Sequence, residues 1–185
     1  MKAVLLLTVL TLTGLGMAAM PATAGDLKVG DQAPNFKLQA TDGKTYQLSD
    51  FKGKESVVLA WFPKAFTQGC TIECKSLAEH GDMLKKYNAQ YFMISVDPIE
   101  GDKGNKAFAD SLHADFPLLS DPAKETANAY GVLNVERGFA NRWTFYIGKD
   151  GKITAIDKDV NKRLATSAED MAATLKQLGT ETKKK

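Results

Sequence analysis

The spacing of hydrophobic and polar residues predicts a hairpin followed by a buried strand in the first part of the chain. Residues 36–48 alternate between apolar and polar positions around Asp42-Gly43, a dipeptide that favours the tight turn of a β-hairpin. Residues 56–62, SVVLAWF, are continuously β-branched or apolar and too short for a helix, which is typical of a central strand. Pro63 ends this strand.

The next segments predict an alternation of helix and strand. Apolar positions recur at helical spacing from Thr71 to Tyr87, which predicts one helix that begins near Cys70. Residues 91–97 predict a second buried strand, and residues from about 103 to 112 predict another helix.

The last part predicts a short strand at 117–119 and then a short helix that Asp121 caps, with Pro122 at its first position. Residues 142–156 predict a second hairpin, and a final helix is expected from near Ser167. Together these elements predict an α/β fold: a mixed β-sheet with helices on both faces and an N-terminal β-hairpin extension.

Length and composition predict one domain behind an export signal. The chain has 185 residues, of which 44% are hydrophobic and 25% are charged. Residues 1–24 combine an early lysine, a long apolar run and a small-residue cleavage site, which predicts a signal peptide. We therefore expect a domain at 27–180, a basic C-terminal tail at 181–185, and export, with the bacterial periplasm as the expected compartment.

The net charge gives no indication of a nucleic-acid partner, because the formal value is only +2. The residue directly after the predicted cleavage site is Gly25 and not a cysteine, so a lipid anchor is not predicted, and we expect no membrane association after signal cleavage. The expected state is a monomer or a weak dimer.

The two cysteines, Cys70 and Cys74, are the only ones in the chain. A disulfide between them would close a very short loop and add little stability, so chemistry or metal binding explains them better. A helix N-terminus favours the thiolate, which makes Cys70 the candidate nucleophile and leaves Cys74 more thiol-like. Thr67 can offer a hydroxyl, and Glu73 can anchor a cation.

This stretch resembles the peroxiredoxins of the AhpC/TSA superfamily. Pro63, Thr67 and Cys70 reproduce their Pro-x-x-x-Thr-x-x-Cys signature, and FPKAFTQGCTIE is similar to the bacterioferritin-comigratory, or Q-type, branch. The resemblance runs from about residue 28 to residue 179 and includes RWTFYIGKDGKI.

The resemblance implies a thioredoxin-like fold and a set of roles. Cys70 would be the peroxidatic cysteine, Thr67 and Arg142 would bind and polarise the peroxide, and Glu73 would hold the arginine. Cys74 would be the candidate resolving cysteine, with packing in the core as the alternative. Arg137 competes with Arg142, which we favour because an arginine at a strand start can point at Cys70.

The implied function is that of a thiol-dependent peroxidase with an antioxidant role and no cofactor or metal. It would reduce hydrogen peroxide and organic hydroperoxides through a cysteine sulfenic acid, recycled by a thioredoxin-like or other thiol donor. Attack on an O–O bond needs a deprotonated sulfur and donors aimed at the growing charge on oxygen, which fits Cys70 and Arg142.

Two details depart from the Q-type pattern. Gln68-Gly69 stands where that branch usually has Pro-Gly, and Cys74 lies four residues after Cys70 rather than five. In an intact helix this spacing puts the two Cα atoms about 6 Å apart, so a disulfide would require the first turn to loosen.

Two other functions share parts of this pattern. Copper chaperones of the Sco type also carry Cys-x-x-x-Cys with a distant histidine, although here Arg142 and its neighbour stand where that histidine is expected. His80 and His113 are the only histidines, and we expect both on helix surfaces or ends. A thiol-disulfide reductase is the third hypothesis, but such enzymes use Cys-x-x-Cys.

Overall fold

The computed structural model describes residues 26–183, so the predicted signal peptide lies outside the described residues. The strands are β1 (Lys37–Ala40), β2 (Thr45–Gln47), β3 (Ser56–Trp61), β4 (Ala89–Ser95), β5 (Leu118–Ser120), β6 (Leu133–Asn134), β7 (Phe139–Ala140), β8 (Thr144–Ile147) and β9 (Ile153–Asp157). Seven of them form one mixed sheet in the order β2-β1-β5-β4-β3-β8-β9, and β6 pairs with β7 apart from it.

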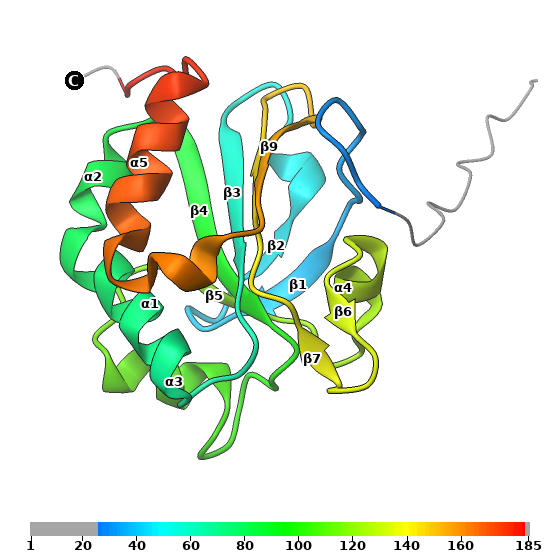
Figure 1. Cartoon of the computed structure of the whole chain (residues 1–185), viewed down its shortest axis with the longest axis vertical. Coiled ribbons are helices and arrows are strands. Elements are labelled where there is room, and N and C mark those ends of the chain that lie inside the picture. The colour runs from blue at the N-terminus through cyan, green and yellow to red at the C-terminus, as the bar shows by residue number, and fades with distance from the viewer. Residues whose placement is uncertain (1–25, 184–185) are drawn as a thin grey trace, which may run out of the picture.

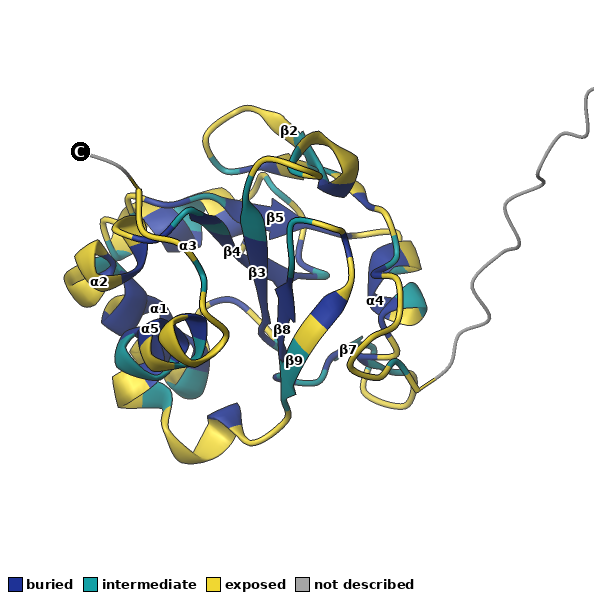
Figure 2. Cartoon of the chain, turned by 90° about the horizontal axis from the view of Figure 1, so that it is seen from above, coloured by how far each residue is buried: buried dark blue, intermediate teal, exposed yellow. Residues whose placement is uncertain are grey.

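Helices cover both faces of this sheet. They are α1 (Gln68–His80), α2 (Asp82–Lys85), α3 (Asn105–Ser111), α4 (Glu125–Ala129) and α5 (Ser167–Gln177), with short 3-10 segments η1 (Leu48–Asp50), η2 (Val160–Lys162) and η3 (Leu164–Thr166). In Figure 1 and Figure 2, α1, α2, α3 and α5 lie on one side of the sheet and α4 lies on the other. This arrangement confirms the predicted class.

Strand β3 lies at the centre and is buried on both sides, as its unbroken apolar sequence predicts. Val58, Ala60 and Phe62 belong to the hydrophobic cluster that contains α1 and α5, whereas Leu59 and Trp61 belong to the cluster on the opposite face. Figure 2 shows the buried strands between the two helical layers.

The pairing of β3 determines what lies next to its C-terminal end. β3 runs parallel to β4 and antiparallel to β8, with Ala60 opposite Thr144. Beyond the ladder, the Trp61 N–H donates to the carbonyl oxygen of Trp143 at 2.9 Å. The end of β3, which leads into α1, therefore lies beside the residues that precede β8.

The single helix expected from near Cys70 to Tyr87 is wrong in its extent. Helix α1 begins two residues before Cys70, ends at His80, and is followed by the separate helix α2 after Gly81. A Cβ atom at Gly81 would lie 2.6 Å from the Leu77 carbonyl oxygen and 2.7 Å from the Tyr91 hydroxyl. The apolar period continues across this break, so periodicity alone does not reveal it.

The expected position of Pro122 is also wrong. Helix α4 begins at Glu125, and Lys124 before it has a left-handed backbone with a φ of 62°. Asp121 nevertheless accepts a hydrogen bond from the Ala127 N–H at 2.7 Å. A turn thus separates Pro122 from the helix, and Asp121 reaches across that turn.

The last described residues pair with the rest of the domain. Thr182 forms an isolated β-bridge with Tyr87, and the Lys183 N–H donates to the Lys86 carbonyl oxygen at 2.8 Å. We call residues 180–183 the C-terminal strap. Among the described residues, no helix is both long enough and apolar enough to cross a membrane.

Candidate active site

Cys70 lies in the first turn of α1, directly behind the end of β3. The first hydrogen bond of the helix runs from the Thr71 N–H to the Thr67 carbonyl oxygen at 2.9 Å, so the three N–H groups before it have no acceptor within the helix. This end of the helix carries the positive end of the macrodipole. Cys70 is fully buried and is a free thiol, so its sulfur lies in a dry place where the local field favours negative charge.

The loop between β3 and α1 is fixed by buried polar groups. The Ala65 N–H donates to a carboxylate oxygen of Asp97 at 2.8 Å, and the Ser95 hydroxyl donates to the same oxygen at 3.0 Å. Phe66 has a left-handed backbone with a φ of 61°, an unusual conformation for an aromatic residue. The end of β4 therefore holds the turn that places Cys70.

Arg142 approaches Cys70 from the start of β8. Its Nη2 atom donates to the Cys70 sulfur at 3.0 Å, and the side chain is almost fully buried. Burial lowers the pKa of Arg142, but the charges of Glu73 and Cys70 raise it by more, so the guanidinium stays a cation. The Cys70 sulfur therefore has a fixed cation in direct contact with it.

Glu73 holds the other side of this guanidinium. Its Oε2 atom forms an ion pair with Nη1 of Arg142, and its Oε1 atom is buried with no hydrogen-bond partner. Burial raises the pKa of Glu73 to about 7, although Arg142 pulls it down. The negative charge of Asp157 adds to the rise. Glu73 thus titrates near neutral pH, and its charge governs how firmly Arg142 is held.

Cys74 lies one turn further along α1, in the core. It is fully buried, and burial raises the pKa of its thiol to about 12, with further contributions from the charges of Glu73 and Cys70. Cys74 is therefore a neutral thiol at neutral pH, as its position on the apolar stripe suggests. No disulfide joins it to Cys70.

Thr67 is in place at the start of the helix but its hydroxyl is engaged elsewhere. It is the N-cap residue of α1, it is exposed, and its hydroxyl donates to the Lys64 carbonyl oxygen at 2.9 Å. The structure therefore brings Cys70, Glu73 and Arg142 together, while the Thr67 hydroxyl bonds to the preceding loop.

Asn161 in η2 completes the surroundings of Arg142, and sequence reasoning missed it. Its Oδ1 atom accepts a hydrogen bond from Nε of Arg142 at 2.9 Å. Asn161 is an exposed polar residue in a polar connection, so nothing in the pattern singles it out. Asp97 was also missed, because its position before a proline indicated only the end of a strand.

The two histidines do not join the cysteines. His80 lies 2.6 Å from a carboxylate oxygen of Glu169, at the exposed contact of α1 with α5. His113 follows α3 with a left-handed backbone, at a φ of 52°. Within residues 26–183, no three histidine, cysteine, aspartate or glutamate side chains form a group that could hold a metal ion.

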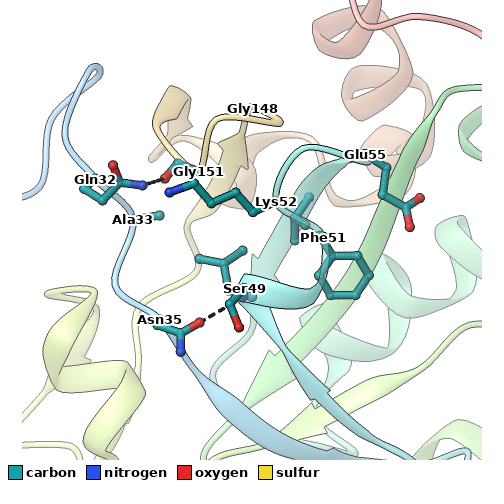
Figure 3. A pocket seen from close by; sticks show the side chains of 11 residues that line it. Gln32, Ala33, Asn35, Ser49, Phe51, Lys52, Glu55, Gly148 and Gly151 are labelled. Carbon is teal, nitrogen blue, oxygen red and sulfur yellow. Dashed lines mark hydrogen bonds between the residues drawn. The ribbon is translucent and has the colours of Figure 1, made fainter.

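A pocket with a volume of about 190 Å³ lies away from this site. It is lined by Leu48, Val57 and the turn between β8 and β9, with Asn35 at its edge (Figure 3). Val57 is near the start of β3, whereas Cys70 follows the end of that strand, so the pocket and the cysteines are at opposite ends of the sheet. The chemistry of the site does not involve it.

The comparison with known families identifies the chain. Residues 29–156 match the model of the AhpC/TSA family. The chain belongs to the AhpC/TSA family of peroxiredoxins. The match includes the segment that carries Cys70, Glu73 and Arg142, the three side chains that meet in the structure.

Individual peroxiredoxins extend this result. The chain is 36% identical over 140 residues to peroxiredoxin Bcp of Escherichia coli K12, with 72% of this chain and 86% of that protein covered. It is 36% identical over 129 residues to alkyl hydroperoxide reductase E of Mycobacterium tuberculosis, with 69% and 82% covered.

A solved structure shows the same fold. The crystal structure of peroxidoxin BcpB from Mycobacterium tuberculosis is similar with a TM-score of 0.71 and 28% identity, over 82% of this chain and 98% of that one. The thioredoxin-like fold implied by the resemblance is confirmed. Membership of the peroxiredoxin family favours the peroxidase interpretation over the copper and reductase hypotheses.

Proposed function

We propose that this peroxiredoxin reduces hydrogen peroxide and organic hydroperoxides with Cys70 as the peroxidatic cysteine. The observation that carries the proposal is the contact of Arg142 Nη2 with the Cys70 sulfur at 3.0 Å, inside a buried site at a helix N-terminus. Glu73 holds the same guanidinium by an ion pair. These contacts supply a stabilised thiolate and a fixed donor beside it.

The reaction balances with the groups present. The Cys70 thiolate attacks the outer oxygen of the peroxide, a sulfur–oxygen bond forms, and the O–O bond breaks. Sulfur is oxidised to sulfenic acid by two electrons, the peroxide is the oxidant, and the departing oxygen takes one proton from solvent water and leaves as water or an alcohol. Arg142 stabilises the negative charge that develops on this oxygen, because its donors never deprotonate.

Thr67 has a proposed role at the entrance to the site. Its hydroxyl is exposed and bonds to the Lys64 carbonyl oxygen, in the loop that leads to Cys70. In the complex it exchanges this bond for one to the peroxide, so that Thr67 and Arg142 orient the O–O bond toward sulfur.

Recycling consumes thiols. A thiol condenses with the sulfenic acid to form a disulfide and water, and a thioredoxin-like or other thiol donor then reduces that disulfide. Cys74 is the candidate resolving thiol, and because it is buried in α1 the first turn of that helix must open before the two sulfurs can bond. The signal peptide, the periplasmic location, the antioxidant role and a monomeric or weakly dimeric state belong to the same proposal.

The test is the consumption of hydrogen peroxide by the purified chain. We expect Cys70→Ser to abolish it and Cys74→Ser to leave the first turnover nearly intact, because only Cys70 contacts Arg142. Mass spectrometry after one equivalent of hydrogen peroxide then shows whether Cys70 and Cys74 become linked.

Two results would contradict this proposal. Equal loss of the first turnover in both variants would overturn the assignment of the nucleophile. A stoichiometric Cu(I) site that is lost on changing His80 or His113 would support the copper chaperone instead.

A further inference from the structure

The guanidinium of Arg142 is held on three sides, and two of the three partners come from α1. Nη2 bonds to Cys70 and Nη1 bonds to Glu73, whereas Nε bonds to Asn161 at 2.9 Å from η2. A guanidinium is flat and rigid, so the Nε contact with Asn161 and the Nη1 contact with Glu73 together fix the plane in which Nη2 lies. Asn161 therefore controls which way Nη2 points.

We propose that Asn161 is a positioning residue for peroxide reduction, acting through Arg142; this rests on the proposed function. It keeps Nη2 directed at the Cys70 sulfur and at the oxygen that departs from it. Without the Nε contact, the plane of the guanidinium could turn while Nη1 keeps its ion pair with Glu73. A misplacement of about 1 Å in a catalytic site can lower the rate on the order of 100-fold.

The neutrality of the amide matters as much as its position. Arg142 already faces one carboxylate, that of Glu73, and its remaining positive charge acts on the Cys70 sulfur. The amide oxygen of Asn161 accepts a hydrogen bond without adding a negative charge. A carboxylate at the same place would compete with sulfur for the cation and disfavour the thiolate.

The segment that carries Asn161 is attached to the rest of the molecule on both sides. Val160 before it is buried, and Leu164 after it lies beside the first turn of α1, 3.2 Å from where a Cβ atom of Gly69 would be. Further on, the Ala168 N–H donates to the Ser76 hydroxyl of α1 at 3.2 Å. The connection from β9 to α5 thus holds Asn161 over Arg142, although Asn161 itself is exposed.

The hydrogen bond from Arg142 Nε to Asn161 is partly buried and has a charged donor, so its loss costs about 1.5–3 kcal/mol of stability. A positioning role is therefore separated from a structural one by the rate and its pH profile, not by stability alone. We expect Asn161→Ala to lower the rate of Cys70 oxidation by hydrogen peroxide on the order of 10-fold to 100-fold, while the chain stays folded at the assay temperature. Stopped-flow kinetics from pH 5 to pH 9 measure the rate.

Asn161→Asp separates orientation from charge. Aspartate retains the acceptor for Nε, so the rate should recover toward the parent value at a pH where the thiolate is fully formed. The thiolate absorbance should, however, appear at higher pH than in the parent. Asn161→Ala should stay slow even when its sulfur is fully ionised.

A double variant tests whether the effect passes through Arg142. In a chain that already carries Arg142→Ala, adding Asn161→Ala should cause no further loss, because the residue that Asn161 orients is gone. Asn88→Ala is the control, since the side-chain amide of the half-buried Asn88 also makes one hydrogen bond, to the Lys54 carbonyl oxygen at 3.1 Å, at the opposite end of the sheet. It should react like the parent.

The possible results separate a failure of the Asn161 role from a failure of the proposed peroxidase function. A parent chain that does not react with hydrogen peroxide would contradict the proposed function itself. A reactive parent with an equally fast Asn161→Ala variant at every pH would overturn the role of Asn161 alone. Additive losses in the double variant would do the same.

Discussion

Arg142 shows how three weak features of single residues combine into a reactive site. The arginine alone is an ordinary residue at a strand start, Glu73 alone is an ordinary acid in a first helical turn, and Cys70 alone is a small buried side chain. Their contacts place a cation on a buried sulfur, with a carboxylate behind it. The activity we propose depends on the geometry of this group more than on any one member.

We expect Arg142→Ala to slow Cys70 oxidation by hydrogen peroxide on the order of 100-fold to 1,000-fold, since one preorganised donor to the departing oxygen is lost. Arg142→Lys should recover only part of the rate, because an ammonium cannot reach sulfur and oxygen together. Stopped-flow rates measured where each thiolate is fully formed give the comparison. An unchanged rate in Arg142→Ala would exclude it as the polarising residue and make Arg137 the next candidate.

Glu73 predicts a dependence of stability on pH. Its pKa is raised in the folded protein from an ordinary 4.5 to about 7, so the folded state binds this proton more tightly than the unfolded state does. The resulting contribution to stability is present below pH 4.5 and is lost as the pH rises through about 7. The parent should therefore lose unfolding free energy relative to Glu73→Gln between about pH 5 and pH 8.

Denaturant unfolding of both proteins at several pH values measures this difference. Glutamine is the matched control because it keeps the shape of the side chain and does not titrate. If the parent instead gained stability over Glu73→Gln with rising pH, the ion pair with Arg142 would dominate over burial, and the predicted direction would be wrong.

At the residue scale, the sequence predicted those residues of the candidate site that lie close together along the chain. Cys70 and Glu73 followed from their place in one helical turn and from the resemblance to peroxiredoxins. Arg142 followed from the same resemblance and from the expectation that an arginine at a strand start can point at Cys70. Asn161 could not be predicted, because its role depends on where a polar connection lies in space.

At the scale of elements, the first turn of α1 depends on the absence of a side chain. A Cβ atom at Gly69 would lie 3.3 Å from Nη2 of Arg142 and 3.2 Å from a methyl group of Leu164. Glycine lets the guanidinium approach the helix closely enough to reach Cys70. The close contact between α1 and the start of β8 is thus possible because the backbone at Gly69 carries no side chain.

Two glycine-to-alanine changes in α1 and at its end should therefore differ in effect. Gly69→Ala should slow peroxide reduction with little loss of stability, because only side chains must move. Gly81→Ala should destabilise the fold by about 1–3 kcal/mol and leave the chemistry intact, because its Cβ would meet the backbone oxygen of Leu77 at 2.6 Å. Thermal unfolding and stopped-flow oxidation of both variants give the answer. A destabilised Gly69→Ala with a normal rate, or a stable Gly81→Ala with a slow rate, would contradict this prediction.

The elements themselves were predictable where burial is regular. Both hairpins, the central strand and the last helix follow from periodicity and turn residues, and the structure confirms them. The break at Gly81 and the late start of α4 were not predictable. At Gly81 the Leu77 carbonyl oxygen and the Tyr91 hydroxyl leave no room for a Cβ atom, and before α4 the Asp121 carboxylate accepts from the Ala127 N–H. Both features depend on the packed structure, which periodicity does not encode.

At the scale of the whole molecule, the C-terminal strap joins the segment between α2 and β4 to the turn between β8 and β9. The Asn88 N–H donates to the Glu181 carbonyl oxygen at 2.6 Å, and Lys149 forms an ion pair with Glu181 at 2.6 Å. The strap therefore connects the segment after α5 to the start of β4 and to the turn between β8 and β9. It lies at the opposite end of the strands from Cys70.

Removing residues 181–185 should lower stability without affecting catalysis. Loss of two backbone hydrogen bonds and one exposed ion pair corresponds to about 1–2 kcal/mol, or a fall in Tm of roughly 2–8 °C for a domain of this size. Differential scanning calorimetry measures the shift, and the rate of Cys70 oxidation serves as the control. An unchanged Tm would show that the strap is only loosely attached, and a slower reaction would show that it supports the site.

The separation of Cys70 and Arg142 by 72 positions has a consequence during synthesis. A growing chain exposes both cysteines long before the arginine is made, and the two can meet only after β8 has docked against β3. Until then Cys70 is an ordinary thiol with no cation on its sulfur. On the proposed function, the nascent chain should therefore react only slowly with peroxide until β8 has paired with β3.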